Sequence, residues 1–152
     1  MKSCVFCNVS KENGFNILWE DDKYIAFYDR DPACRYHVQL IPKAHIRSVK
    51  SLTKDDAQLV RNMAAIGTSI LDQLDVPKDM RKMGFHIPPF NSVSHLHLHV
   101  QGLPYKNFFR AAKYPVTRGG KWHDKGFSYF VDVDQVIRIL EKGSGVGISP
   151  CS

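Results

Sequence analysis

Residues 94–100 read Ser-His-Leu-His-Leu-His-Val, a strict alternation of imidazoles with apolar side chains. In a β-strand, successive side chains point to opposite faces of the sheet. His95, His97 and His99 therefore share one face, and the two leucines share the other face with Val100. We expect the apolar face to pack on the core and the imidazoles to line a surface or cleft.

Three roles compete for these histidines. In a structural role, each imidazole needs its own buried hydrogen-bond partner. A three-histidine metal site is disfavoured because three imidazoles in one strand span about 13 Å, too far for one ion to contact all of them. The third role is chemistry on a substrate, since imidazole can act as nucleophile, acid or base near neutral pH. Ser92 and Ser94 favour this role, because hydroxyl groups can donate to a phosphoryl oxygen.

The flanking sequence predicts an α+β domain of antiparallel strands and two helices. Residues 53–76 carry apolar side chains at helical spacing behind a Thr53–Asp56 capping pair, and residues 132–142 predict a second amphipathic helix. We expect one domain over residues 1–142 and a flexible C-terminal tail over residues 143–152. The stretches that read as strands are 16–20, 23–28, 36–42, 81–87, 95–101 and 127–131.

The chain of 152 residues is long enough for one domain with a single core. Its hydrophobic content of 43% and charged content of 24% are ordinary for a globular protein. No apolar run approaches the roughly 20 residues of a membrane-spanning helix, so we expect no membrane partner. The first ten residues lack the apolar stretch of a signal peptide, and a cytoplasmic or nuclear location is the default expectation.

The net charge of +6 comes almost entirely from residues 105–125, where six basic residues stand against one acidic residue. Basic and aromatic side chains together indicate a surface for a polyanion or nucleotide, so nucleic acid is a candidate partner. A solvated loop with extended lysine side chains explains the same composition. The interleaved aromatic residues are Phe108, Phe109, Tyr114 and Trp122.

The order of these motifs resembles the histidine triad (HIT) family, whose signature is His-φ-His-φ-His-φ, with φ an apolar residue. Four further stretches agree in order, CVFC at 4–7, AFYD at 26–29, HVQLIPKAHI at 37–46 and MGFHIPPFNS at 83–92. The resemblance runs from residue 4 to about residue 105. It implies a five-stranded antiparallel sheet with two helices, often paired as a homodimer with a ten-stranded sheet. Hint-type proteins and aprataxins are the most similar branches, the latter also over residues 121–143.

The resemblance implies a nucleotidyl hydrolase that cleaves adenosine 5′-phosphoramidate or related AMP conjugates without a metal. His97 corresponds to the nucleophile, which attacks the α-phosphorus and forms an adenylyl-histidine intermediate that water opens to release AMP. His95 corresponds to the residue that orients the nucleophile, while His99 and Ser92 correspond to phosphate contacts.

The resemblance also implies a binding site for the rest of the nucleotide. Asp29 corresponds to the acceptor of the ribose hydroxyls. His86 stands where many Hint proteins have an asparagine that helps hold the phosphate or leaving group. The apolar purine slot corresponds to Phe6, Leu18 and Phe27.

An alternative function is aprataxin-like removal of AMP from 5′-adenylated DNA ends. The basic segment with Trp122 and His123 favours it. Aprataxins carry a C-terminal zinc finger, but residues after His123 include only Cys151 and no histidine, so we expect no such finger in this sequence. A third alternative is a non-catalytic nucleotide-binding protein, which the complete triad argues against.

Cys4 and Cys7 form a Cys-x-x-Cys pair that is open to three interpretations. A thioredoxin-like redox pair is expected next to a βαβ unit, which this sequence does not predict. Two reduced cysteines can also be small apolar side chains. The third interpretation is a structural zinc site, and the resemblance implies its ligands as Cys4, Cys7, His45 and His95, a normal set for zinc.

Overall fold

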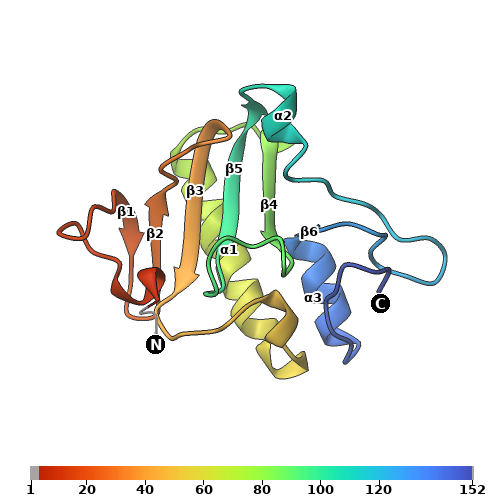
Figure 1. The fold of residues 1–152 in the computed structure, drawn as a ribbon. Helices are drawn as coiled ribbons and strands as arrows, with labels where there is room; N and C mark the ends of the chain where they lie inside the picture. Colours follow the sequence, from red (N-terminus) through yellow and green to blue (C-terminus); the bar gives the residue numbers. More distant parts are fainter. Residues whose placement is uncertain (1–3, 152) are drawn as a thin grey trace.

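The computed structural model describes residues 4–151 and has a six-stranded antiparallel sheet in the order β1-β2-β3-β5-β4-β6 (Figure 1). The strands are β1 (Ile17–Glu20), β2 (Tyr24–Tyr28), β3 (Cys34–Pro42), β4 (Arg81–His86), β5 (Leu98–Tyr105) and β6 (Phe130–Asp132). The α-helices are α1 (Ala57–Gln73), α2 (Phe108–Ala111) and α3 (Val133–Glu141). The 3-10 helices are η1 (Val5–Asn8), η2 (Val49–Ser51), η3 (Lys54–Asp56) and η4 (Lys78–Met80).

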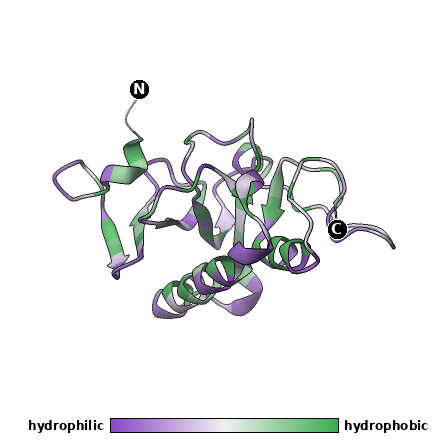
Figure 2. Cartoon of the chain, turned by 90° about the horizontal axis from the view of Figure 1, so that it is seen from below, coloured by the Kyte–Doolittle hydropathy of each residue, from purple (hydrophilic) through white to green (hydrophobic). Residues whose placement is uncertain are grey.

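Helices α1 and α3 cover the same face of the sheet, with their apolar sides turned towards it (Figure 2). Leu96, Leu98 and Val100 lie in the core cluster on this face, which confirms the orientation predicted from the alternation. Helix α1 packs closely at Gly67, where an added Cβ would lie 2.5 Å from the Met83 sulfur. The imidazoles therefore point to the face opposite the helices.

The two predicted helices are confirmed, but the first is shorter at both ends than the predicted 53–76, and it ends at Gln73. Thr53 and Asp56 form the expected capping box, but the pair opens η3, and α1 begins at Ala57. Asp132 caps α3 by accepting a hydrogen bond from the Asp134 N–H at 2.9 Å. Among residues 4–151, no helix combines the length and apolarity needed to cross a membrane.

The sheet has one strand more than the five that the family resemblance implies. The additional strand is β6, which pairs with β4 from Gly84 opposite Asp132 to His86 opposite Phe130. At Gly84, a Cβ would lie 2.4 Å from the Val131 carbonyl oxygen, so this position accepts only glycine. Both neighbours of β4 thus come from the same chain, and β1 and β6 are the edge strands.

Residues 144–151 pack against the domain, in contrast to the flexible tail expected from the sequence. Val146 is buried, and Cys151 pairs through its backbone with Lys125. The Lys125 side chain is fully buried, and its ammonium group donates to the carbonyl oxygens of Gly126, Ser128 and Ile148 at 2.8–3.0 Å. A buried ammonium needs such acceptors, and the tail supplies one of them.

We expect Lys125→Met to destabilise the fold by about 2–3 kcal/mol, because three buried carbonyl oxygens lose a charged donor. Urea unfolding measures the loss, and hydrogen exchange should rise in residues 144–151. Lys121→Met, at an exposed position, is the control and should change little. Equal stability of the two variants would show that the ammonium group does not hold the tail.

Candidate active site

The three histidines lie across the start of β5. His99 is within the strand, whereas His95 and His97 precede it. All three imidazoles are buried, with His97 only 6% exposed, and His95 and His97 line a small cavity below the surface. Phe6 of η1 covers His97 and Tyr114 covers His99, at ring-centroid distances of 5.4 and 5.3 Å.

His97 has the arrangement of a neutral nucleophile. Its Nδ1 lies 2.7 Å from the His95 carbonyl oxygen, which can only accept, so Nδ1 carries the proton and Nε2 carries a lone pair. Burial lowers the pKa of His97 to about 4, which keeps the ring neutral at physiological pH. Orientation of the nucleophile therefore comes from the backbone of His95 and not from its imidazole.

His99 is held between two further histidines. Its Nδ1 lies 2.8 Å from Nε2 of His37, and its Nε2 lies 3.3 Å from Nδ1 of His86. His86 Nε2 in turn donates to the Lys113 carbonyl oxygen at 2.7 Å. Burial lowers the pKa of His37 and His86, and lowers that of His99 well below its ordinary value. The cluster is therefore uncharged near neutral pH.

Asp29 lies beside this cluster and remains partly exposed. Its Oδ2 accepts a hydrogen bond from the Gln39 side-chain amide at 2.6 Å, and its Oδ1 accepts one from the Asp31 N–H at 2.8 Å. The Oε1 of Gln39 is buried and has no partner among the residues that the structure describes. This pair offers a carboxylate and a free carbonyl oxygen, both of which can accept from hydroxyl groups.

The predicted purine slot is only partly assembled. Phe6 and Phe27 contact each other, with ring centroids 5.2 Å apart, and Phe15 lies 4.9 Å from Phe27. Leu18 instead packs on the helix-covered core, and its neighbour Ile17 joins the Phe6–Phe27 cluster. The register of β1 is irregular between Ile17 and Trp19, and both Leu18 and Trp19 turn towards the helix-covered core.

Ser92 is exposed in the loop that precedes the triad. The cavity between this loop and His97 has a volume of about 10 Å³, room for a single water molecule. It is lined in part by Asn91 and Val93.

The zinc ligands expected from the resemblance come together. The distances are 3.4 Å from Cys4 Sγ to His95 Nδ1, 3.3 Å from Cys7 Sγ to His45 Nδ1, and 3.2 Å between the two Nδ1 atoms. Zinc bonds of 2.0–2.3 Å in a tetrahedron put ligand atoms roughly 3.3–3.8 Å apart. His95 Nε2 donates to the Pro42 carbonyl oxygen at 2.8 Å, the second contact that metal-bound histidines usually make. These four side chains fit a zinc ion.

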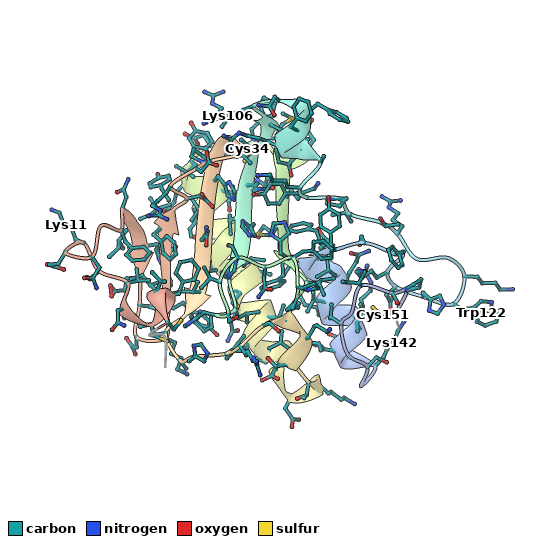
Figure 3. All side chains as sticks on the ribbon, viewed as in Figure 1. Lys11, Cys34, Lys106, Trp122, Lys142 and Cys151 are labelled. Atoms are coloured by element: carbon teal, nitrogen blue, oxygen red, sulfur yellow. The ribbon has the colours of Figure 1, made fainter. Side chains whose placement is uncertain are left out.

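The basic segment at 105–125 does not form one basic surface. Lys125 is buried, and Arg110 is paired with Asp31 at 2.8 Å. Lys106 lies near α2, whereas Trp122 lies at the far side of the molecule beyond β6 (Figure 3). Phe108 and Phe109 are each 80% exposed on α2. The basic and aromatic side chains of residues 105–125 therefore lie in two separate regions, one around α2 and one beyond β6.

His37, Gln39 and Tyr114 belong to the site but were not among the residues predicted for it. The alternation in β3 could have indicated the first two, since His37 and Gln39 share one face and pair in register with Gln101 and His99 of β5. Tyr114 follows α2 and has no local pattern. Only the tertiary structure places its ring against His37 and His99.

Comparisons with known proteins agree with this arrangement. Residues 3–114 match the family model described as scavenger mRNA decapping enzyme C-term binding. The chain is 43% identical over 116 residues to the Arabidopsis thaliana bifunctional adenosine 5′-phosphosulfate phosphorylase/adenylylsulfatase HINT4, an alignment that covers 74% of this chain and 79% of that protein. It is 36% identical over 148 residues to the Danio rerio adenosine 5′-monophosphoramidase HINT3, covering 93% and 84%.

Two more distant similarities complete the comparison. Danio rerio aprataxin is 29% identical over 133 residues, which cover 86% of this chain but only 38% of aprataxin. A HIT family hydrolase from Clostridium thermocellum superimposes with a TM-score of 0.62 at 28% identity, covering 71% of this chain and 96% of that one. The chain therefore belongs to the histidine triad superfamily, as a Hint-type protein with similarity to aprataxins.

The neutral histidine cluster makes stability depend on pH. His37, His86 and His99 have lowered pKa values in the folded state, so unfolding takes up protons below about pH 6.5. Their contribution to stability is complete above that pH and is lost as the pH falls. We expect urea unfolding to show a free energy of unfolding that falls as the pH is lowered from 7.5 to 5.

His86→Asn should make this pH dependence shallower, because it removes one of the three groups whose pKa is lowered by folding. His123→Asn, at an exposed position, is the matched control and should leave the dependence unchanged. A flat profile in the unmodified protein would contradict a buried neutral cluster.

Proposed function

We propose that this protein is a nucleotidyl hydrolase that releases AMP from adenosine 5′-phosphoramidate or a related AMP conjugate. The observation that carries the proposal is His97, whose Nδ1–H donates to the His95 carbonyl oxygen and leaves the Nε2 lone pair free. The relatives named as an adenosine 5′-monophosphoramidase and as an adenosine 5′-phosphosulfate phosphorylase/adenylylsulfatase support this substrate class.

The reaction proceeds in two displacements at the α-phosphorus. Nε2 of His97 forms a bond to phosphorus while the bond to the leaving amine, sulfate or carboxylate breaks, with an amine taking up a proton from solvent as it leaves, which gives an adenylyl-histidine. The ring becomes cationic at that point, and the His95 carbonyl oxygen stabilises it by accepting the Nδ1–H. Water then attacks phosphorus and gives up a proton to solvent, the P–N bond to His97 breaks, and AMP leaves with the neutral imidazole restored.

The other residues of the site bind and polarise the nucleotide. His99 contacts the phosphoryl oxygens, and Ser92 reaches the phosphate and leaving group once the loop closes on the substrate. Asp29 accepts hydrogen bonds from the ribose hydroxyls, with the free Oε1 of Gln39 beside it. The purine lies against the Phe6–Phe27 cluster.

A zinc ion held by Cys4, Cys7, His45 and His95 has a structural role in this proposal. It would tie η1, which carries Phe6, to the segment that carries the triad. The zinc takes no part in the two displacements, because His95 acts on the nucleophile through its backbone carbonyl oxygen.

A second candidate is removal of AMP from adenylated 5′ DNA ends. The exposed Phe108 and Phe109 on α2 favour it, because their rings can stack with bases near the site. The division of the basic segment disfavours it. A homodimer that continues the sheet would use β1, β6 or the part of β4 before Gly84, since β6 pairs with β4 from Gly84 to His86.

His97→Ala should abolish turnover of adenosine 5′-phosphoramidate, because no other group replaces the attacking Nε2. We expect AMP affinity to change by less than about fivefold, since binding uses the other residues of the site. Isothermal titration measures binding, and ammonia release measures turnover. Retained turnover would contradict the assignment of the nucleophile.

The ratio of kcat/KM for adenosine 5′-phosphoramidate and for a 5′-adenylated nicked DNA separates the two candidates. We expect fast cleavage of the phosphoramidate and little repair of the DNA. Preference for DNA, with an affinity that falls steeply with salt, would establish the second candidate.

We expect one zinc per chain in the purified protein by elemental analysis. Cys7→Ser should remove the metal and lower the melting temperature, because the site links η1 to the triad segment. Cys151→Ser is the matched control, since Cys151 lies outside the cluster and should leave zinc content unchanged. A metal-free protein with unaltered stability in Cys7→Ser would argue for reduced spectator cysteines.

A further inference from the structure

We propose that Gln39 of β3 is a specificity-determining residue, whose side-chain oxygen accepts a hydrogen bond from one ribose hydroxyl while Asp29 accepts one from the other. The inference rests on the proposed function, because it takes an adenosine nucleotide as the ligand. It narrows the substrates to AMP conjugates in which both ribose hydroxyls are free. Neither the triad motif nor the names of the relatives assign a role to Gln39.

Gln39 lies between the apolar cluster and the triad. In the register of the sheet, it stands opposite Phe27 of β2 on one side and opposite His99 of β5 on the other. Residues directly opposite each other in neighbouring strands project from the same face of the sheet. Phe27 belongs to the cluster proposed for the purine, and His99 is proposed to contact the phosphate. In a nucleotide the ribose joins these two groups, so Gln39 lies at the position expected for the ribose.

A hydrogen bond to Asp29 fixes the orientation of the Gln39 amide. Gln39 Nε2 lies 2.6 Å from Asp29 Oδ2. A carboxylate oxygen accepts, so the amide nitrogen faces Asp29 and the amide oxygen lies on the other branch of the side chain. This oxygen, Oε1, is buried and has no hydrogen-bond partner within residues 4–151. A buried acceptor without a donor is costly, and a hydroxyl group of a ligand would satisfy it.

Asp29 retains capacity for a second hydroxyl. Its Oδ1 accepts from the Asp31 N–H at 2.8 Å, and a carboxylate oxygen can accept two hydrogen bonds. His37 Nε2 lies 3.6 Å from Oδ2, which is too long for a hydrogen bond. Each oxygen of Asp29 can therefore accept one more donor. The Gln39 amide and the Asp31 N–H hold the carboxylate in place for that donor.

Two adjacent acceptors match the two hydroxyl groups of a ribose. A 2′-deoxy or 3′-deoxy ribose lacks one donor and leaves one of these acceptors unpaired. Polar sites reject analogues most strongly in this situation, because the unpaired group stays desolvated. A phosphate on the 3′ oxygen would bring negative charge against Asp29. The pair therefore selects ribonucleotides with free hydroxyls, and this selection takes place at the ribose and not at the leaving group.

Binding of AMP, 2′-deoxy-AMP and 3′-deoxy-AMP to the full-length protein tests the inference by isothermal titration. The unmodified protein should bind each deoxynucleotide about 10- to 50-fold more weakly than AMP. Gln39→Met has a similar volume and no hydrogen-bonding group, and the loss of affinity for one of the two deoxynucleotides should shrink to less than about threefold. The loss for the other should persist, because Asp29 is still present.

Gln73→Met, at an exposed position of α1, is the matched control and should discriminate as the unmodified protein does. Equal binding of the three nucleotides by the unmodified protein would overturn the role of Gln39. An unchanged discrimination against both deoxynucleotides in Gln39→Met would overturn it as well. A weaker affinity that is shared equally by all three nucleotides is such a result, since it shows only that the side chain supports the site.

Turnover of adenosine 5′-phosphoramidate, measured alongside, separates this inference from the proposed function. If the protein cleaves the phosphoramidate and Gln39→Met discriminates as before, only the role of Gln39 fails. If the protein shows the expected discrimination among the three nucleotides but cleaves no phosphoramidate, the proposed reaction fails and the recognition of the ribose stands. A protein that binds none of the three nucleotides would overturn both.

Discussion

The packing of α1 on β5 is the constraint on which the rest of this structure depends. Leu98 and Val100 enter the core beneath the helix, and Gly67 lets the helix come close enough to bury them. Because the strand alternates, burying these two side chains commits His99 to the opposite face and His97 follows two residues earlier. The hydrophobic effect on one side of the sheet thus sets the position of the chemical groups on the other.

The histidines on that opposite face are buried, which determines how they behave. Imidazoles in water would be partly protonated near pH 6.5 and free to exchange tautomers. Here burial favours the neutral form, and fixed donors and acceptors of the backbone stand at both ends of the cluster. The Ala33 N–H and the Lys113 carbonyl oxygen orient His37 and His86, and the His95 carbonyl oxygen orients His97. Backbone groups therefore define the protonation pattern of the site.

The C-terminal third of the chain completes this environment. β6 takes the edge of β4, and Phe130 at its start lies 5.2 Å from the His86 ring. The Lys125 ammonium group joins the 117–128 region to the last residues by binding three carbonyl oxygens. Lys125 is counted in the positive charge of residues 105–125, yet its side chain lies in the interior of the protein. The net charge of a segment therefore does not show that its surface is basic.

The sequence by itself determined the main helices and strands of this protein, and which side chains of residues 95–100 share a face of the sheet. Alternation at 95–100, helical spacing after Thr53 and the cap at Asp132 are local patterns, and local geometry is enough to interpret them. Cys4, Cys7, His45 and His95 were identified from family motifs as a set of metal ligands. The structure brings these four side chains together. Tertiary structure alone decided the burial of the triad, the pairing of β6 with β4, the packed tail, and the place of Leu18, His37 and Tyr114. These depend on contacts between segments far apart in the chain, which periodicity within one segment cannot specify.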